Sequence, residues 1–172
     1  LYRNCEAFLF PSEGEGFGMP FGYDEESRLC GLIKDRIYVE IERHIELGVR
    51  RFVSGMAQGA DIWCAEAVMD YKARRPEQDI RLTAVIPYAG QSSRWDINYK
   101  NRYFSILETA DDVVLISKEY ISGCMHQRNR YMVDNSTHLI AIYGGGTGGT
   151  KYTLDYARKR GLSVTIINPG RL

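Results

Sequence analysis

Two arginines and a glycine-rich turn stand close together in the last third of the sequence. Arg128 and Arg130 precede an apolar run, His138 to Tyr143, which is typical of a buried strand. Five glycines and two threonines follow directly, from Gly144 to Thr150. Backbone N–H groups at the start of a helix after such a turn face an anion, and guanidiniums contact phosphate in a bidentate manner. The chemistry that this stretch predicts is the binding of a phosphate group.

A second arrangement of strand, glycine turn and helix stands earlier in the chain. The strand R-F-V-S, residues 51–54, runs into G-M-A-Q-G-A-D, residues 55–61, and a helical pattern follows. Gly55 and Gly59 would let the backbone approach a ligand closely, and Asp61 could accept a hydrogen bond from a ribose hydroxyl. The alternative is that the glycines serve only close packing and that Asp61 caps the helix. Two such turns in one small chain favour a ligand.

The predicted ligand site has contributions from both turns and from the segments near them. Gly148, Gly149 and Thr150 would cradle the phosphate, and Arg128 would neutralise it. Either of two aspartates would bind a hydroxyl or hold an arginine in place. A loop tryptophan could stack on a base, although such a residue more often anchors its loop to the core. The full set is Gly55, Met56, Gly59, Ala60, Asp61, Trp95, Arg128, Asn129, Asp134, Gly148, Gly149 and Thr150.

Composition narrows the classes of function. Lys+Arg and Asp+Glu both number 22 in 172 residues, so no global field favours nucleic acid, which is the less favoured partner and would need a local patch. The four cysteines are widely spaced with no C-x-x-C pair, which favours free thiols in the cytoplasm. No apolar run reaches the roughly 20 residues of a membrane span, so no membrane partner is expected. A homodimer is left open. No Ser-His-Asp set, metal-ligand cluster or pair of carboxylates is evident, which favours binding over catalysis.

The elements that must position these residues alternate between strands and helices. This alternation predicts parallel pairing with right-handed crossovers, and hence an α/β Rossmann-like three-layer sandwich with a mostly parallel sheet. We expect one domain over residues 1–172, with residues 1–20 as an atypical N-terminal segment. Ligands of such sheets bind beyond the carboxyl ends of the strands. The expected strands are Arg51–Ser54, Ile80–Ile86, Asp112–Ser117, His138–Tyr143 and Ser163–Ile167, with a sixth candidate at Glu6–Phe10.

From about Pro20 to its C-terminal end, the sequence resembles an uncharacterised bacterial family of the SLOG superfamily, which is related to the DNA-processing protein A and lonely-guy phosphoribohydrolase groups. The resemblance implies a Rossmann-like domain that binds a nucleotide or a nucleotide derivative at this edge of the sheet. It rests on P-F-G-Y-D-E-E-S (residues 20–27), S-G-M-A-Q-G-A-D-I-W (54–63), the loop 87–95, G-C-M-H-Q-R-N-R-Y-M-V-D (123–134) and G-G-T-K-Y-T (148–153).

The first twenty residues depart from this pattern. The family opens with a strand followed by T-G-H-R-P, which this chain lacks. Residues 1–20 instead resemble a fragment of the nucleotide-sugar site of retaining glycosyltransferases. In that motif a second Glu would stand eight residues after Glu15, and Tyr23 occupies that position here. A remnant of a glycosyltransferase is therefore one alternative function.

The second departure concerns catalysis. The resemblance to the lonely-guy enzymes gives their arginine a counterpart in Arg128, but Thr153 stands where those enzymes have a glutamate. We expect Thr153 on the first turn of a helix, where a glutamate would be tolerated. The leading function is therefore a non-catalytic nucleotide-binding sensor or adaptor. The alternatives are an N-glycosidic hydrolase of nucleoside monophosphates and a DNA-binding module.

Overall fold

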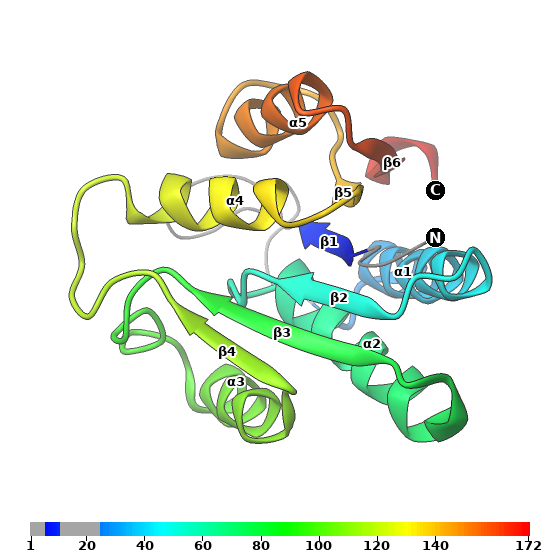
Figure 1. Cartoon of the computed structure of the whole chain (residues 1–172), viewed down its shortest axis with the longest axis horizontal. Helices are drawn as coiled ribbons and strands as arrows, with labels where there is room; N and C mark the ends of the chain where they lie inside the picture. Colours follow the sequence, from blue (N-terminus) through cyan, green and yellow to red (C-terminus); the bar gives the residue numbers. More distant parts are fainter. Residues whose placement is uncertain (1–5, 11–24) are drawn as a thin grey trace.

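The fold is built on a parallel β-sheet. A computed structural model describes residues 6–10 and 25–172. Within them the strands form one six-stranded sheet of order β4-β3-β2-β1-β5-β6, and every neighbouring pair is parallel (Figure 1). The α/β Rossmann-like prediction is confirmed. The strands are β1 (Glu6–Phe10), β2 (Arg51–Ser54), β3 (Arg81–Ile86), β4 (Asp112–Leu115), β5 (His138–Ile142) and β6 (Ser163–Ile167).

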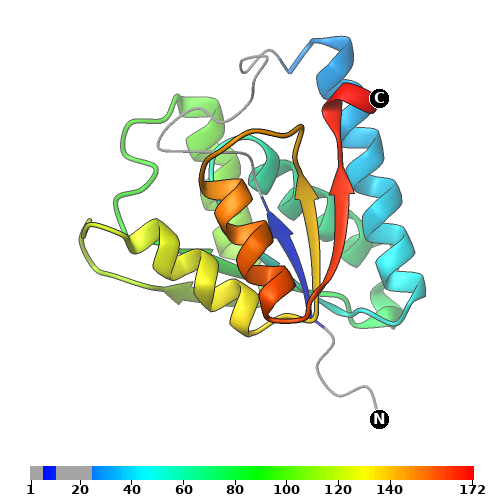
Figure 2. The ribbon, with the colours of Figure 1, turned by 90° about the horizontal axis from the view of Figure 1, so that it is seen from above.

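Helices cover both faces of this sheet, as right-handed crossovers require. Successive strands from β1 to β4 step in one direction, so the helices that join them lie on one face. The chain then crosses back to β5 and steps the other way, which puts α4 and α5 on the opposite face (Figures 1 and 2). The helices are α1 (Arg28–Glu46), α2 (Ala60–Arg74), α3 (Ile97–Thr109), α4 (Cys124–Asp134) and α5 (Gly149–Lys159), with short 3-10 helices η1 (Pro76–Gln78) and η2 (Pro169–Arg171).

The spacing of apolar residues along the sequence determines which face of each helix or strand is buried. In α1 an apolar residue recurs every fourth position, which aligns one stripe of the helix with the sheet. These isoleucines, from Ile33 to Ile45, are at most 1% exposed. Ser27 caps the helix by accepting a hydrogen bond from the Cys30 N–H at 3.2 Å. The helix therefore begins and faces inward for reasons that are visible in the sequence.

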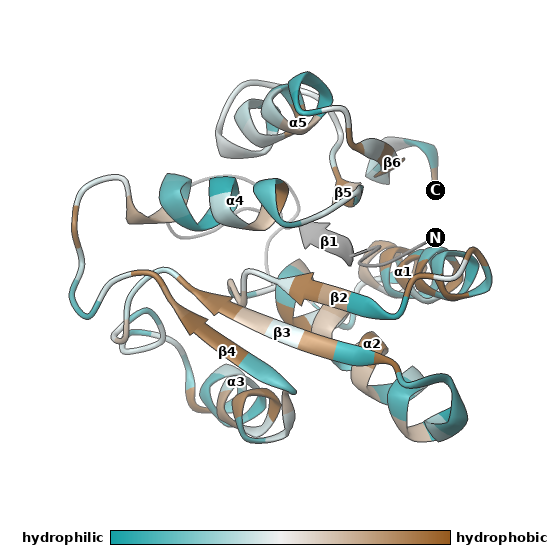
Figure 3. Ribbon diagram, viewed as in Figure 1, coloured by the Kyte–Doolittle hydropathy of each residue, from teal (hydrophilic) through white to brown (hydrophobic). Residues whose placement is uncertain are grey.

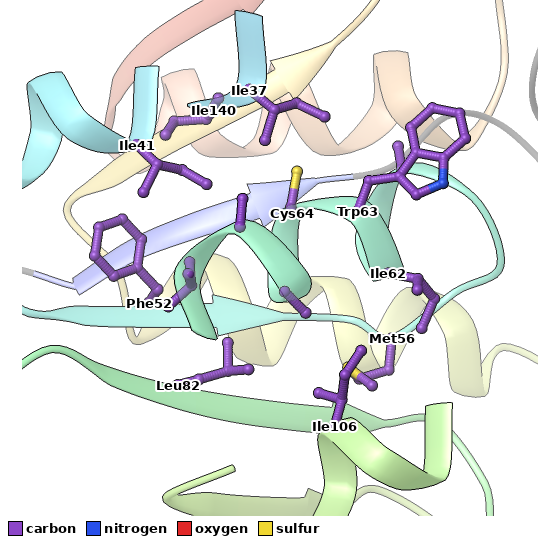
Figure 4. Close-up of a cluster of buried hydrophobic side chains, with 14 of the residues drawn as sticks. Ile37, Ile41, Phe52, Met56, Ile62, Trp63, Cys64, Leu82, Ile106 and Ile140 are labelled. Atoms are coloured by element: carbon purple, nitrogen blue, oxygen red, sulfur yellow. The ribbon is translucent and has the colours of Figure 1, made fainter. Parts of the chain in front are cut away.

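Alternation along the strands divides the core in two. Phe52 and Leu82 point to the side covered by α1, α2 and α3 (Figure 4), whereas Val53 and Val85 point to the side covered by α4 and α5. Figure 3 shows hydrophilic residues at the first positions of β2, β3 and β4 and hydrophobic ones further along. β2 and β3 thus contribute to two apolar layers, as expected for strands that lie between helices.

Three of the expected strand ends differ from the structure. β3 begins at Arg81 rather than at Ile80, and β5 ends at Ile142 rather than at Tyr143. The largest difference is in β4, which ends at Leu115 rather than at Ser117 and has exposed apolar side chains. Val113 is 49% exposed and Leu115 is 45% exposed. The reason is topological, because β4 is the edge of the sheet and has a neighbour on one side only.

The reversal of strand order creates the position where such folds bind ligands. β1 and β5 are neighbours in the sheet, and the chain leaves them in opposite directions. The carboxyl ends of β1 and β5 therefore form the switch point of the fold. The two glycine turns follow β2 and β5, on either side of β1, so the topology brings them to the same edge.

Candidate functional site

A buried arginine lies beneath the glycine turn of residues 55–61, which is the first of the two turns along the chain. Arg128 belongs to the second turn of α4 and is 5% exposed. Its Nη1 donates to the carbonyl oxygen of Gly55 at 2.8 Å, and its Nε donates to Oδ1 of Asn129 at 3.0 Å. These bonds use two of the five N–H groups of the guanidinium. The arginine is thus held from two sides before it meets any ligand.

The same network continues to the glycine turn of residues 144–150, which is the second along the chain. Nδ2 of Asn129 donates to Oγ1 of Thr153 at 3.2 Å, and Oγ1 of Thr153 donates to the carbonyl oxygen of Gly149 at 3.1 Å. Asn129 and Thr153 are buried. A continuous path of hydrogen bonds therefore runs from Gly55, through the side chains of α4, to the first turn of α5. It fixes the spacing between the two turns.

The side chain of Asp61 stabilises the turn of residues 55–61 from the interior of the protein. Its side chain is fully buried, and its Oδ2 accepts a hydrogen bond from the Ala57 N–H at 2.8 Å. A Cβ atom on Gly55 would stand 3.0 Å from this Oδ2 and 3.0 Å from the guanidinium of Arg128. The next residue, Met56, has a positive φ of 56°, and its carbonyl oxygen accepts from Nε2 of Gln91 at 2.6 Å. Glycine at position 55 is therefore required by the close approach of two charged side chains.

The charges of Arg128 and Asp61 do not fully balance each other at neutral pH. Burial raises the pKa of Asp61 to about 7, although the Arg128 charge and the Ala57 N–H both act to lower it. Burial also lowers the pKa of Arg128, and Asp61 opposes that shift. A guanidinium nevertheless remains protonated in proteins. Near pH 7 the site therefore carries a net positive charge for part of the time. In addition, Oδ1 of Asp61 is buried without a hydrogen-bond partner among the described residues.

Three helices begin at glycines, which have no side chain that could cap the first N–H groups. The N-caps of α2, α4 and α5 are Gly59, Gly123 and Gly148, and none of them makes a side-chain cap. By contrast, Ser27 caps α1 and Asp96 caps α3 through their side-chain oxygens. Uncapped N–H groups carry the positive end of the helix dipole, which favours an anion. The helices without a side-chain cap are α2 and α5, which follow the two glycine turns, and α4, which carries Arg128.

Comparison with protein families identifies the family of the chain. The model of the YspA SLOG family matches residues 17–169, which is most of the chain. The chain belongs to this SLOG family. It is 34% identical over 131 residues to a UPF0398 protein of Halalkalibacterium halodurans, covering 74% of this chain and 68% of that protein. It is 29% identical over 143 residues to the uncharacterized SPbeta prophage-derived protein YoqJ of Bacillus subtilis, covering 74% and 81%. The superfamily resemblance seen in the sequence is thereby confirmed, and these relatives are bacterial.

Most of the predicted site residues of this SLOG domain come together, but two do not. Trp95 packs its ring against Tyr103, with centroids 5.3 Å apart at 79°, and so anchors its loop to α3. Asp134 is the last residue of α4, where its Oδ1 accepts from the Tyr156 hydroxyl and pairs with Nε of Arg160, both at 2.9 Å. Because α4 runs antiparallel to the strands, Asp134 lies at the end of the helix away from the glycine turns.

The remaining predicted residues lie at the turns themselves. Ala60 and Thr150 are buried in the first turns of α2 and α5, while Gly149 is partly exposed. The expectation that a glutamate would be tolerated at position 153 does not hold. Thr153 is 1% exposed and joins the hydrogen-bond path, so a glutamate there would bury a carboxylate. Gln91 was not selected from the sequence, because a loop glutamine carries no periodic signal.

Three other expectations concern metal ligands, membrane-spanning helices and the motif in residues 1–20. Among the described residues, no group of three His, Cys, Asp or Glu side chains could hold a metal ion. Within the same ranges, none of the helices has the combination of length and apolar composition needed to cross a bilayer. The motif in residues 1–20, with Glu15 and the position of Tyr23, lies outside the described residues.

Proposed function

We propose that this SLOG domain binds a nucleotide or nucleotide derivative by holding one of its phosphate groups between the two glycine turns. The buried Arg128 guanidinium carries the proposal, since it contacts the first turn directly and reaches the second through Asn129 and Thr153. A buried cation with an incompletely ionised partner is costly unless an anion approaches it. A phosphate at this edge would offset that cost.

The N-terminus of α5 supplies the other half of the proposed phosphate site. Gly148 has a φ of 137°, which favours glycine, and the backbone turns there into Gly149 and Thr150. Their N–H groups would donate to phosphate oxygens while Arg128 neutralises the charge. Asp61 would act as a positioning residue rather than as a ligand for a ribose hydroxyl, because its side chain is fully buried. Its contact with the Ala57 N–H supports this role.

We further propose that the domain is a sensor or adaptor rather than an enzyme. Cleavage of an N-glycosidic bond develops positive charge on the ribose, which a nearby carboxylate would stabilise. Asp61 is enclosed, and Thr153 holds the place of the glutamate in the related hydrolases. The buried free thiols of Cys30, Cys64 and Cys124 support a role in the reducing cytoplasm.

The test is a calorimetric comparison of AMP with adenosine. A charge-assisted hydrogen bond contributes about 1.5–3 kcal/mol, so AMP should bind at least about tenfold more tightly. Arg128→Lys should weaken AMP binding because a lysine cannot donate to Gly55 and Asn129 in the same fork geometry. Arg158→Lys is the matched control, since Arg158 lies near the end of α5 and pairs there with Asp155.

Two results would count against this function. Equal affinities for AMP and adenosine would show that the protein does not recognise the phosphate group. Release of free adenine from AMP by the native protein, abolished in Arg128→Lys and retained in Arg158→Lys, would instead make the domain an N-glycosidic hydrolase.

A further inference from the structure

A basic hollow lies next to the start of the glycine turn of residues 144–150. It has a volume of about 560 Å³ and is lined by the last two residues of β6, by residues that follow β5 and β6, and by Arg36 of α1. Figure 2 shows α1 running beside β6 and the C-terminal end of the chain. Arg36 of α1 and Arg171 of η2 face this hollow, together with Gly144, Gly145 and Asn168. The hollow therefore has two guanidiniums and exposed backbone in its wall.

The charged side chains that line the hollow, Arg36 and Arg171, are both cationic. Arg36 pairs with Oε1 of Glu40 at 2.8 Å, but the same carboxylate also faces Arg43, whose Nη1 lies 3.5 Å from Oε2. One buried carboxylate thus serves two arginines. Within the described part of the chain, Arg171 forms no ion pair, and no acidic side chain is among the residues that line the hollow. An anion entering this space would meet attraction from two guanidiniums.

The backbone at the start of the turn is open to the hollow. A Cβ atom at Gly145 would meet nothing within 4 Å, and its φ of 105° is one that glycine adopts readily. Gly145 and Gly148 are three residues apart along one turn, so their backbones are separated by about 11 Å at most. A single small molecule could therefore reach from the N-terminus of α5 into the hollow.

We propose that this hollow is a second anion subsite, which receives another phosphate or carboxylate group of the same ligand. The inference rests on the proposed function, because it takes the first phosphate to lie at the N-terminus of α5. The ligand class that follows is a nucleotide derivative with two separated anionic groups. Arg36 and Arg171 would determine specificity for it, whereas a nucleoside monophosphate would fill only the first subsite.

The experiment compares AMP with adenosine 3′,5′-bisphosphate on the whole chain. The bisphosphate should bind about tenfold more tightly than AMP. Arg36→Gln and Arg171→Gln should each remove most of this advantage and leave AMP binding unchanged. Arg158→Gln is the matched control, since Arg158 pairs with Asp155 on α5 and does not line the hollow. Equal affinities for the two nucleotides, or a bisphosphate advantage that survives both hollow variants, would overturn the proposal.

A separate arm keeps this proposal distinct from the function of the first site. If the native protein binds neither nucleotide, the proposed function fails, and inorganic pyrophosphate becomes the probe for the hollow. The Nε–H resonances of Arg36 and Arg171 should then shift in an NMR titration, while that of Arg158 should not. Such shifts would support an anion site in the hollow independently of nucleotides. Unmoved resonances at millimolar pyrophosphate would refute it.

Discussion

Replacing Arg128 by methionine removes the guanidinium between the two turns while keeping a long unbranched side chain. At pH 6 Asp61 is mostly protonated, because burial raises its pKa to about 7. The cost of the substitution is then mainly the lost donation to the Gly55 carbonyl and to Asn129, partly offset by the burial of the thioether. Hydrogen bonds from a charged group contribute about 1.5–3 kcal/mol each, so we expect a loss of about 2 kcal/mol in the free energy of unfolding.

The cost should grow at higher pH. Removing Arg128 also removes the charge that lowers the pKa of Asp61, so the pKa of this carboxyl rises further in the variant. Above pH 7 the folded variant then keeps a proton that its unfolded state has released, whereas the native protein has lost that proton in both states. The stability of the variant should therefore fall by about 1.4 kcal/mol per pH unit relative to the native protein. At pH 8.5 the total cost should be about 4 kcal/mol.

Urea unfolding at pH 6 and pH 8.5 measures this difference. The double variant Asp61→Asn with Arg128→Met is the control, because an amide cannot titrate and the extra loss at high pH should disappear. A cost for Arg128→Met that is the same at both pH values would refute the electrostatic coupling of the pair. A cost near zero at pH 6 would show that the bonds to Gly55 and Asn129 contribute nothing to stability.

Two further predictions concern the first turn. Gly55→Ala should destabilise the protein by about 1–3 kcal/mol, because its Cβ would crowd Arg128 and Asp61. Gly144→Ala is the control and should change the stability by no more than about 0.5 kcal/mol, since its Cβ would come no closer than 3.8 Å to Pro169. Equal urea midpoints for the two variants would contradict this prediction. The native protein should lose stability as pH rises from about 4 to 7, because the folded pKa of Asp61 lies above its ordinary value of 3.8, and Asp61→Asn should remove that slope in a thermal unfolding series. An unchanged slope in the variant would assign it to other groups.

Local patterns were enough to predict the elements and the edge at which the turns meet. The apolar repeat every four residues in α1 and the apolar run of β5 each depend on neighbours along the chain, and periodicity reports such neighbours directly. The alternation of strands and helices then implies parallel pairing, and parallel pairing places every turn after a strand at the carboxyl edge. Gly55 and Gly148 were therefore assigned to one edge from the sequence, together with the family motifs that contain them.

The sequence alone could not give contacts between distant elements. Arg128 and Gly55 are 73 positions apart, and their contact depends on where the crossover to β5 sets α4 above the sheet. The assignment of Asp134 to the site fails for a related reason. It stands six residues after Arg128 on a helix that rises about 1.5 Å per residue, so it lies about 9 Å further along the axis, away from the turns.

Residue types and spacing thus determined the fold class, the family and the presence of two glycine turns. The tertiary structure alone decided that Arg128 is a buried member of a hydrogen-bonded path, that Asp61 is its enclosed partner and that Trp95 faces α3. The physical reason is that helix and strand periods are set by local backbone geometry, whereas burial and charge pairing are set by which elements the sheet order packs together.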